Sequence, residues 1–467
     1  MSDKRYLEKQ HGEAHFIHPF SHIKKMEGER PLVIEYGEGC YVFDDAGNRY
    51  LEGMSGLWCA SLGFSEKRLV QAAAAQLEQL PYYLCFGKRT HKPGADLAAK
   101  LASIAPAGLE YVLFANSGSE SNDTAVKLVW YYNNALGRPE KKKIIARSQS
   151  YHGVTVASGS LTGQARVQRD FDLPIAKILH TDFPSYYHGR GLGETPEEFS
   201  KRIVASLENL ILKEGPETIA AFIAEPVVTG SGVILPPPGY FEQVQALLKK
   251  YDILFIVDEV VCGFGRTGNM FGSQTYNLAP DMMSVAKGLS SGYQPISALL
   301  VNDAVYGVLS QQSCKLGGFF HGVTYSAHPV AAAVALETIN IYQERDIPAR
   351  VRELAPYFSR RVKALETHLI VGETRSVGLL AGIELAADKR LGKSFEASLG
   401  VPAWVQEDAL KRGLIIRSSG QAVVICPPLI ITEKQIDELF DLLEQSLNAA
   451  LKQFEKHIAA YPATNTE

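Results

Sequence analysis

The sequence has few cysteines, and no two of them stand at the C-x-x-C spacing of a metal clamp or a thiol-exchange site. The six are spread over 467 residues, at Cys40, Cys59, Cys85, Cys262, Cys314 and Cys426. Long apolar runs are also missing, because no stretch approaches the roughly 18 uninterrupted apolar residues of a membrane span. The first residues are charged and lack the apolar segment of a signal peptide. We therefore expect no membrane segment, a reducing compartment and a cytoplasmic location.

The chain also has no large excess of positive or negative charge. The chain has 47 Lys and Arg against 51 Asp and Glu, a formal net charge of −4. This balance argues against a polyanionic partner, so we expect no nucleic-acid binding. The basic run 141–143 is interpreted as a solvated loop. With 46% hydrophobic and 21% charged residues, the composition predicts a folded protein, and the length of 467 residues predicts two or three domains.

Strand-length apolar runs alternate with helical patterns from about residue 60 to 325. This alternation predicts an α/β fold with a mostly parallel central sheet and helices on both faces. The spacing of Ile203, Leu207 and Ile211 predicts an amphipathic helix over 197–214. The expected strands are 111–116, 144–147, 219–225, 253–258, 282–286 and 296–301.

The two ends of the chain have a different pattern. Short β-rich runs separated by a turn at 45–48 predict an antiparallel piece over 32–52. Beyond Pro329 the sequence predicts helix, then strands near 377–385 and 414–417, and a closing helix from Glu433. We expect residues 1–59 and 329–467 to form one smaller, discontinuous α+β domain beside a large domain of residues 60–328.

Ligands of open α/β sheets bind beyond the carboxyl ends of the strands, so the polar residues at those ends are the first candidates for a binding site. Residues 117–123 form a small-residue turn between the strand 111–116 and a helical run at 124–135. Free backbone N–H groups and the positive end of a helix would suit a phosphate. An ordinary serine N-cap explains the same residues equally well.

Three further strand ends are each ambiguous alone. Asp258 is either a functional carboxylate or half of a structural salt bridge. Lys287 is either an amine nucleophile or a surface lysine, and Tyr151 either stacks on a planar ligand or packs in the core. Together with a phosphate cup, these groups match pyridoxal 5′-phosphate (PLP), which has a phosphate, a ring nitrogen, an aldehyde and a flat face.

Three rival motifs are weaker. Residues 263–268 fit the dinucleotide pattern G-x-G-x-x-G, but no helix is predicted to follow. Residues 288–292 fit the serine-hydrolase pattern G-x-S-x-G around Ser290, with His321 and His328 as candidate bases, but a strand follows instead of a helix. Four histidines near the N-terminus have no carboxylate or cysteine to complete a metal site, so no metal is expected; they are His11, His15, His18 and His22.

Taken in order along the chain, the motifs resemble the class III (ω-type) aminotransferases, PLP enzymes of fold type I. The resemblance runs from residues 18–20 and 56–59 to 426–429, and its most specific pieces are 116–120, 151–153, 258–268 and 286–292. By this resemblance, Lys287 binds the cofactor aldehyde and shuttles a proton, and Asp258 pairs with the ring nitrogen. The other implied cofactor-binding residues are Ser117, Gly118, Ser119, Tyr151, His152, Glu225, Val260 and Thr324.

The resemblance also implies a homodimer, or a tetramer built from it, in which Thr324 reaches the phosphate site of the neighbouring subunit. The chain most resembles the branch that transfers amino groups from amines or ω-amino acids to pyruvate. Trp58, Phe86 and Tyr151 match its substrate pocket, and Arg417 matches an arginine that pairs with a substrate carboxylate.

Three departures from relatives lie near the implied pocket: Phe320 stands where many have Asn, Ala327 where they have Gly, and residues 228–229 replace a Gln-Gly pair. The expected activity is a ping-pong transfer from a primary amine, diamine or ω-amino acid to pyruvate. Two alternatives are a class III enzyme that uses α-ketoglutarate, of the 4-aminobutyrate or acetylornithine type, and a serine hydrolase that uses Ser290.

Overall fold

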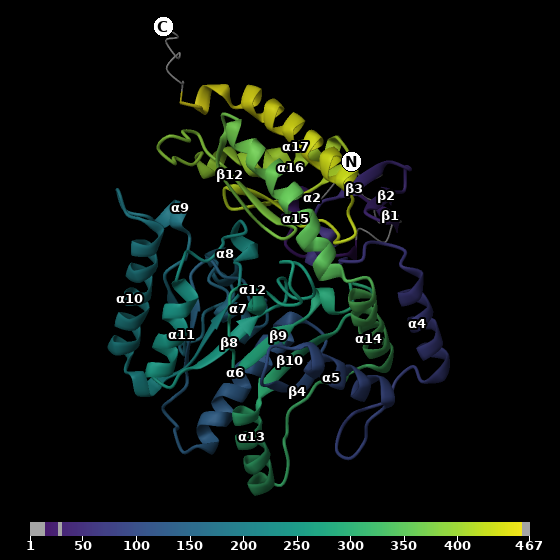
Figure 1. The fold of residues 1–467 in the computed structure, drawn as a ribbon, viewed down its shortest axis with the longest axis vertical. Helices are drawn as coiled ribbons and strands as arrows, with labels where there is room; N and C mark the ends of the chain where they lie inside the picture. The colour runs from purple at the N-terminus through teal and green to yellow at the C-terminus, as the bar shows by residue number, and fades with distance from the viewer. Residues whose placement is uncertain (1–14, 27–29, 460–467) are drawn as a thin grey trace.

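The computed structural model describes residues 15–26 and 30–459. A seven-stranded sheet lies at its centre, in the order β4-β10-β9-β8-β7-β5-β6 (Figure 1). The strands from β9 to β6 are parallel, while β10 is antiparallel to both β4 and β9. The sheet is therefore mostly parallel, as the sequence predicts. Its strands are β4 (Leu109–Ala115), β5 (Lys143–Arg147), β6 (Ile178–Thr181), β7 (Ile219–Ala224), β8 (Leu254–Asp258), β9 (Met282–Val285) and β10 (Ser297–Asn302).

Helices cover both faces of this sheet because alternate strand residues point to opposite sides. Phe222 and Phe255 face an apolar layer that contains Phe241, whereas Ile223 and Ile256 face a second layer. Helices α10 (Pro196–Glu214) and α11 (Tyr240–Lys250) supply the first layer, and α6 (Gly118–Ala135) and α13 (Asp303–Leu316) supply the second. The prediction of helices on both faces is confirmed.

Two smaller sheets contain the ends of the chain. One has the order β1-β2-β3-β13 and the other β11-β12-β15-β14. Strand β13 pairs in parallel with β3, with Leu414 opposite Leu51, and so joins segments more than 350 residues apart. In Figure 1 the purple N-terminal strands lie beside the yellow-green C-terminal region. The strands are β1 (Ile34–Glu38), β2 (Tyr41–Asp44), β3 (Arg49–Glu52), β11 (Val371–Val377), β12 (Leu380–Leu385), β13 (Leu414–Ile415), β14 (Arg417–Ser419) and β15 (Ala422–Ile425).

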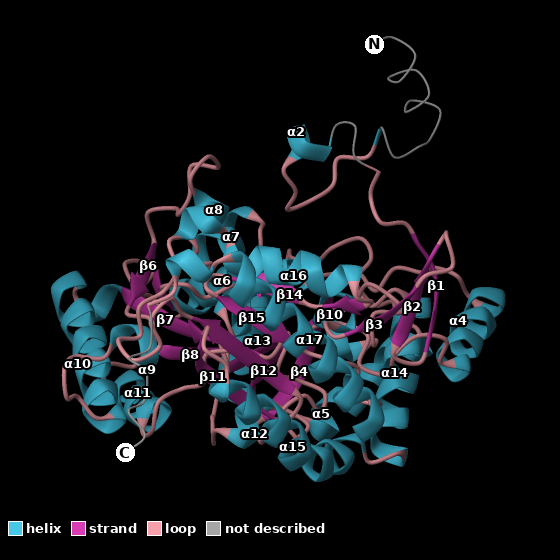
Figure 2. Ribbon diagram, turned by 90° about the horizontal axis from the view of Figure 1, so that it is seen from above, coloured by secondary structure: helices cyan, strands magenta, loops and turns pink. Residues whose placement is uncertain are grey.

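The remaining helices lie in both the central and the outer parts, and Figure 2 shows α2 projecting from the body of the molecule. No helix in residues 15–26 and 30–459 is long and apolar enough to cross a membrane. The remaining helices are α2 (Ile23–Met26), α3 (Ser55–Trp58), α4 (Lys67–Gln79), α5 (Lys92–Ile104), α7 (Val156–Leu161), α8 (Ala165–Gln168), α9 (Tyr186–Gly189), α12 (Gly272–Thr275), α14 (Pro329–Glu344), α15 (Ile347–Ala364), α16 (Val401–Lys411) and α17 (Glu433–Gln453).

Two expectations about local structure are wrong. The basic run is not a solvated loop, since the side chains of Lys141 and Lys142 are buried and donate hydrogen bonds to the carbonyls of Tyr251 and Arg138. The structure also contains strand β6, for which the sequence pattern predicts no strand. It is a four-residue strand at the edge of the sheet, and the half-buried His180 interrupts its apolar pattern.

Candidate active site

A cavity of about 610 Å³ opens beyond the carboxyl ends of the parallel strands and beside the amino end of α6. It brings together all of the predicted site residues except Phe86 and Thr324. The predicted residues that line it are Trp58, Ser117, Gly118, Ser119, Tyr151, His152, Glu225, Asp258, Val260, Lys287 and Arg417.

Asp258 stands at the end of β8, where a buried apolar strand delivers its carboxylate to the cavity. One carboxylate oxygen, Oδ2, accepts hydrogen bonds from Asn122 Nδ2 (2.8 Å) and His152 Nδ1 (2.9 Å). The other, Oδ1, accepts from the backbone N–H of Val260 at 3.0 Å. A carboxylate has about four acceptor positions, so one remains for a ligand. Within the described residues no lysine or arginine pairs with Asp258, and its ionisable partner is His152.

His152 connects Asp258 to a second buried carboxylate, that of Glu225. The His152 ring is fully buried, and its Nε2 lies 3.7 Å from Glu225 Oε2. In the part of the chain that the structure describes, this Nε2 has no hydrogen-bond partner. The buried His152 ring therefore holds the Asp258 carboxylate in place.

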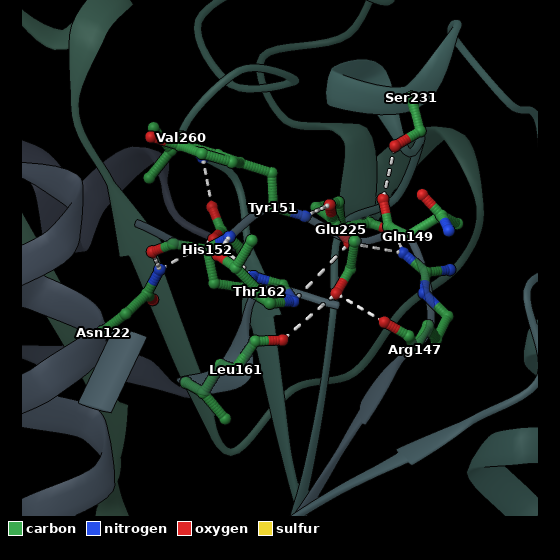
Figure 3. A network of polar contacts seen from close by, with 12 residues as sticks. Asn122, Arg147, Gln149, Tyr151, His152, Leu161, Thr162, Glu225, Ser231 and Val260 are labelled. Atoms are coloured by element: carbon green, nitrogen blue, oxygen red, sulfur yellow. Dashed lines mark hydrogen bonds and ion pairs between the residues drawn. The ribbon is translucent and has the colours of Figure 1, made fainter. Parts of the chain in front are cut away.

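Arg147, at the end of β5, neutralises Glu225 (Figure 3). Its Nη2 donates to Glu225 Oε2 at 2.8 Å and to the Glu225 carbonyl at 2.6 Å. The other carboxylate oxygen, Oε1, accepts the backbone N–H of Tyr151 at 3.0 Å. This buried pair fixes the backbone that presents the Tyr151 ring to the cavity. Sequence reasoning assigned no role to Arg147, although a buried arginine at a strand end implies a carboxylate partner.

Lys287 begins a short 3₁₀ turn, Lys287–Leu289, one residue beyond the end of β9. Its backbone is in the left-handed region, with φ = 46°, which costs a non-glycine residue about 1–2 kcal/mol and is typical of functional positions. Burial lowers the pKa of the Lys287 ammonium, and the nearby Cys59 and Asp258 oppose this only in part. A larger share of the amine is therefore neutral and able to attack a carbonyl carbon.

Helix α6 begins at Gly118 with a capping box, six residues before the helical run expected from the sequence. Ser117 Oγ accepts the N–H of Glu120, whose Oε2 accepts the N–H groups of Asn116 and Ser117. The serine-cap interpretation is thus confirmed for Ser117. The first turn still presents Gly118 and Ser119 to the cavity, with the N–H groups and positive dipole end that suit an anion. A Cβ on Gly118 would come within 3.0 Å of Val260, so the space there is tight.

The cavity lining also includes an apolar and a cationic side chain. The side chain of Trp58 is 8% exposed, and Arg417 is the first residue of β14. Burial and the neighbouring charge of Arg166 lower the pKa of Arg417, against the opposing effect of Tyr151. No carboxylate among the described residues forms an ion pair with Arg417.

Phe86 and Thr324 lie outside this cavity. Phe86 is 46% exposed, and a Cβ on Gly322 would come within 3.2 Å of its ring. The Thr324 carbonyl accepts the hydroxyl of Tyr82 at 2.9 Å. Their implied roles stay predictions. The departures differ in position: Phe320 is 82% exposed, whereas Thr229 lines the cavity and Ala327 is buried.

Sequence reasoning missed several residues at this site. Asn122 Nδ2 bonds Asp258, and Gln164 and Arg166 line the cavity. Asn122 follows Ser117 within the small-residue turn that predicts the phosphate site, so its position in the sequence indicates a residue of the cavity. Gln164 and Arg166 lie at the short helix α8, which has no apolar periodicity to reveal it.

The rival motifs find little support. Ser290 Oγ donates to the Gln294 carbonyl at 2.5 Å, and the chain continues into β10 instead of the helix that a serine-hydrolase elbow requires. Only the four-residue helix α12 follows the glycines at 263–268. Within residues 15–26 and 30–459 no group of three or more metal-ligating side chains is present; His11 lies outside the described residues.

Comparison with known proteins gives a consistent picture. A family model described as "Aminotransferase class-III" matches residues 23–447. Gamma-aminobutyrate transaminase 1, mitochondrial, of Oryza sativa subsp. japonica is 53% identical over 432 residues, which cover 92% of this chain and 84% of the rice protein. Vanillin aminotransferase of Capsicum chinense is 51% identical over 427 residues, covering 91% of this chain and 93% of that protein.

Solved structures agree with these relatives. The omega transaminase from Pseudomonas jessenii in complex with PMP has a TM-score of 0.93 at 45% identity, covering 95% of this chain and 98% of that one. A structure described as "Transaminase with L-ala" has a TM-score of 0.89 at 51% identity, covering 91% of this chain and 100% of the other. The chain therefore belongs to the class III aminotransferases, PLP-dependent enzymes of fold type I.

Proposed function

We propose that the protein transfers an amino group from a primary amine, diamine or ω-amino acid to pyruvate, giving alanine, by a ping-pong mechanism. The observation that carries this proposal is Arg417, a half-buried guanidinium with no carboxylate partner among the described residues, which shares the cavity with Trp58 and Tyr151. The pocket thus offers a carboxylate-binding fork beside apolar rings. The relative solved with L-ala supports alanine as a product.

The residues present fit PLP. Asp258 keeps one acceptor position for a ring N–H, Lys287 offers a partly neutral amine, and the first turn of α6 offers N–H groups for a phosphate. His152, Val260 and Glu225 line the same cavity, and we propose that they complete the cofactor site. When bound, PLP supplies an aldehyde and an electron-withdrawing ring that stabilises negative charge on the adjacent substrate carbon.

Each side chain then has a specific task. With PLP bound, Lys287 would hold the cofactor through its aldehyde group, and its Nζ would carry a proton to and from the substrate carbon. Asp258 holds a proton on the ring nitrogen, while Asn122 and His152 fix the carboxylate. The Tyr151 ring would stack on the flat cofactor, from a backbone that Glu225 positions.

Arg417 binds the substrate carboxylate in one half-reaction and swings away when the donor carries only an alkyl chain. A guanidinium can do both because it is planar, always charged and carried on a flexible stem. Trp58 then provides the apolar surface for the alkyl chain.

The acceptor separates this proposal from its nearest alternative, an enzyme that uses α-ketoglutarate. Relatives named gamma-aminobutyrate transaminases support an ω-amino acid as donor. The test supplies the PLP-loaded protein with 4-aminobutyrate and either keto acid, and measures alanine and glutamate. We expect alanine from pyruvate; glutamate from α-ketoglutarate with no alanine from pyruvate would overturn the proposal.

We further propose a homodimer, or a tetramer built from it, in the cytoplasm. Exposed aromatic side chains on two neighbouring loops, Phe86, Phe320 and Tyr325, support an interface there. The free cysteines support a reducing compartment, although relatives are named mitochondrial or chloroplastic. The pairing of β3 with β13 supports the two-domain division. Light scattering that gives the mass of one chain would contradict the dimer.

A further inference from the structure

Arg166 is a second cationic side chain at the cavity, and it has no part in the roles described above. It belongs to α8 and lines the cavity together with Arg417. It also lines a neighbouring cavity of about 220 Å³. Arg166 is exposed while Arg417 is half-buried, so Arg166 lies at the mouth and Arg417 deeper inside.

The guanidinium of Arg166 is oriented by the protein but not neutralised by it. Gln164 Oε1 accepts hydrogen bonds from Arg166 Nε (3.2 Å) and Nη2 (3.1 Å). Gln164 is itself buried, and its Nε2 donates to Ser231 Oγ at 3.0 Å and to the Gly230 carbonyl at 3.3 Å. Two of the five N–H groups of the guanidinium are therefore used, and three remain for a ligand.

No carboxylate in the described residues pairs with Arg166. Glu396 lines the neighbouring cavity, but no ion pair joins it to Arg166 in this part of the chain. The charge of Arg166 also contributes to the lowered pKa of Arg417, after the larger effect of burial. Two like charges at one cavity repel each other, and a bound carboxylate would relieve that repulsion.

We propose that Arg166 is a specificity-determining residue that binds, together with Arg417, the carboxylate of ω-amino acid donors. The enzyme then favours an amine that carries a remote carboxylate over an alkylamine of the same length. Pyruvate differs because its carboxylate adjoins the reacting carbon, so it reaches the deeper Arg417 but not the mouth. This inference rests on the proposed amine transfer and names the donor class that the same site selects.

The test compares Arg166→Gln with a matched control, Arg169→Gln. Arg169 is an exposed arginine at the end of α8 that lines neither cavity. The donors are 4-aminobutyrate and butylamine, with pyruvate as acceptor. We expect Arg166→Gln to lower the ratio of kcat/KM for 4-aminobutyrate over butylamine about tenfold, which corresponds to about 1.4 kcal/mol. Arg166→Lys should retain part of the preference for 4-aminobutyrate over butylamine, and Arg169→Gln should retain all of that preference.

A second readout does not require turnover. Butyrate, which has the carboxylate but no amine, should bind the PLP-loaded protein several-fold more weakly in Arg166→Gln than in Arg169→Gln, and added salt should narrow that difference. An unchanged donor ratio with unchanged butyrate binding would overturn the role of Arg166, as would equal losses with both donors. If the wild-type protein forms no alanine from either donor, the proposed function fails while the butyrate measurement still decides the role of Arg166.

Discussion

Replacing Arg147 by methionine tests the buried charge pair beneath the active site. Arg147 and Glu225 are 1% and 6% exposed, and Arg147 Nη2 donates to both the carboxylate and the carbonyl of Glu225. Without the guanidinium, Glu225 keeps only the Tyr151 N–H as a hydrogen-bond donor. Removing one partner of a buried pair costs about 3–5 kcal/mol, because the remaining charge is desolvated and uncompensated.

The assay is urea unfolding of the PLP-loaded protein, with the single variant compared to Arg147→Met/Glu225→Gln. The double variant buries no unpaired charge, so it should recover most of the lost free energy of unfolding. The matched control is Arg49→Met, which breaks the exposed pair with Glu438 and should cost less than about 1 kcal/mol. If Arg147→Met is as stable as Arg49→Met, or the double variant is no more stable than the single one, the buried pair does not stabilise the fold in this way.

Three further predictions concern other positions. Burial raises the pKa of Glu259 to about 7. The proton that Glu259 holds therefore stabilises the fold fully below pH 4.5, and this contribution is lost as the pH rises through 7. Between pH 5 and 8 the free energy of unfolding should fall by up to about 3 kcal/mol more in wild type than in Glu259→Gln. Ala327 has φ = 53°, so Ala327→Gly should cost about 1–2 kcal/mol less than Ala335→Gly, which lies inside α14; equal thermal shifts for the two variants would contradict this. Ser290→Ala should keep at least half of the transaminase activity, because its hydroxyl only bonds a carbonyl; a near-complete loss would revive the hydrolase alternative.

The sequence predicted the strands of the central sheet best where an apolar run ends in a polar residue. Strand β8, which ends at Asp258, and β9, which precedes Lys287, are examples. In each case the buried strand and its functional end are continuous in the chain. The start of α6 was expected too late because small polar residues resemble a loop, although the spacing of Ser117 and Glu120 matches the capping box that forms there.

The remaining features depend on contacts between distant segments. Lys142 is buried although it lies in a basic run, because its aliphatic chain is removed from water while its amine donates a hydrogen bond to the carbonyl of Arg138. Arg166 and Arg417 line one cavity only because α8 and β14, about 250 residues apart, meet there. Such a pairing leaves no periodic pattern in either segment, so local sequence reasoning could not find it.

The most direct test of the central claim is borohydride reduction of the PLP-loaded protein, followed by peptide mass mapping. We expect a pyridoxyl adduct on the peptide that contains Lys287, and none on that peptide in a Lys287→Ala variant. Loaded protein that carries no adduct on Lys287, or carries it on another lysine, would contradict the assignment of Lys287 as the nucleophile.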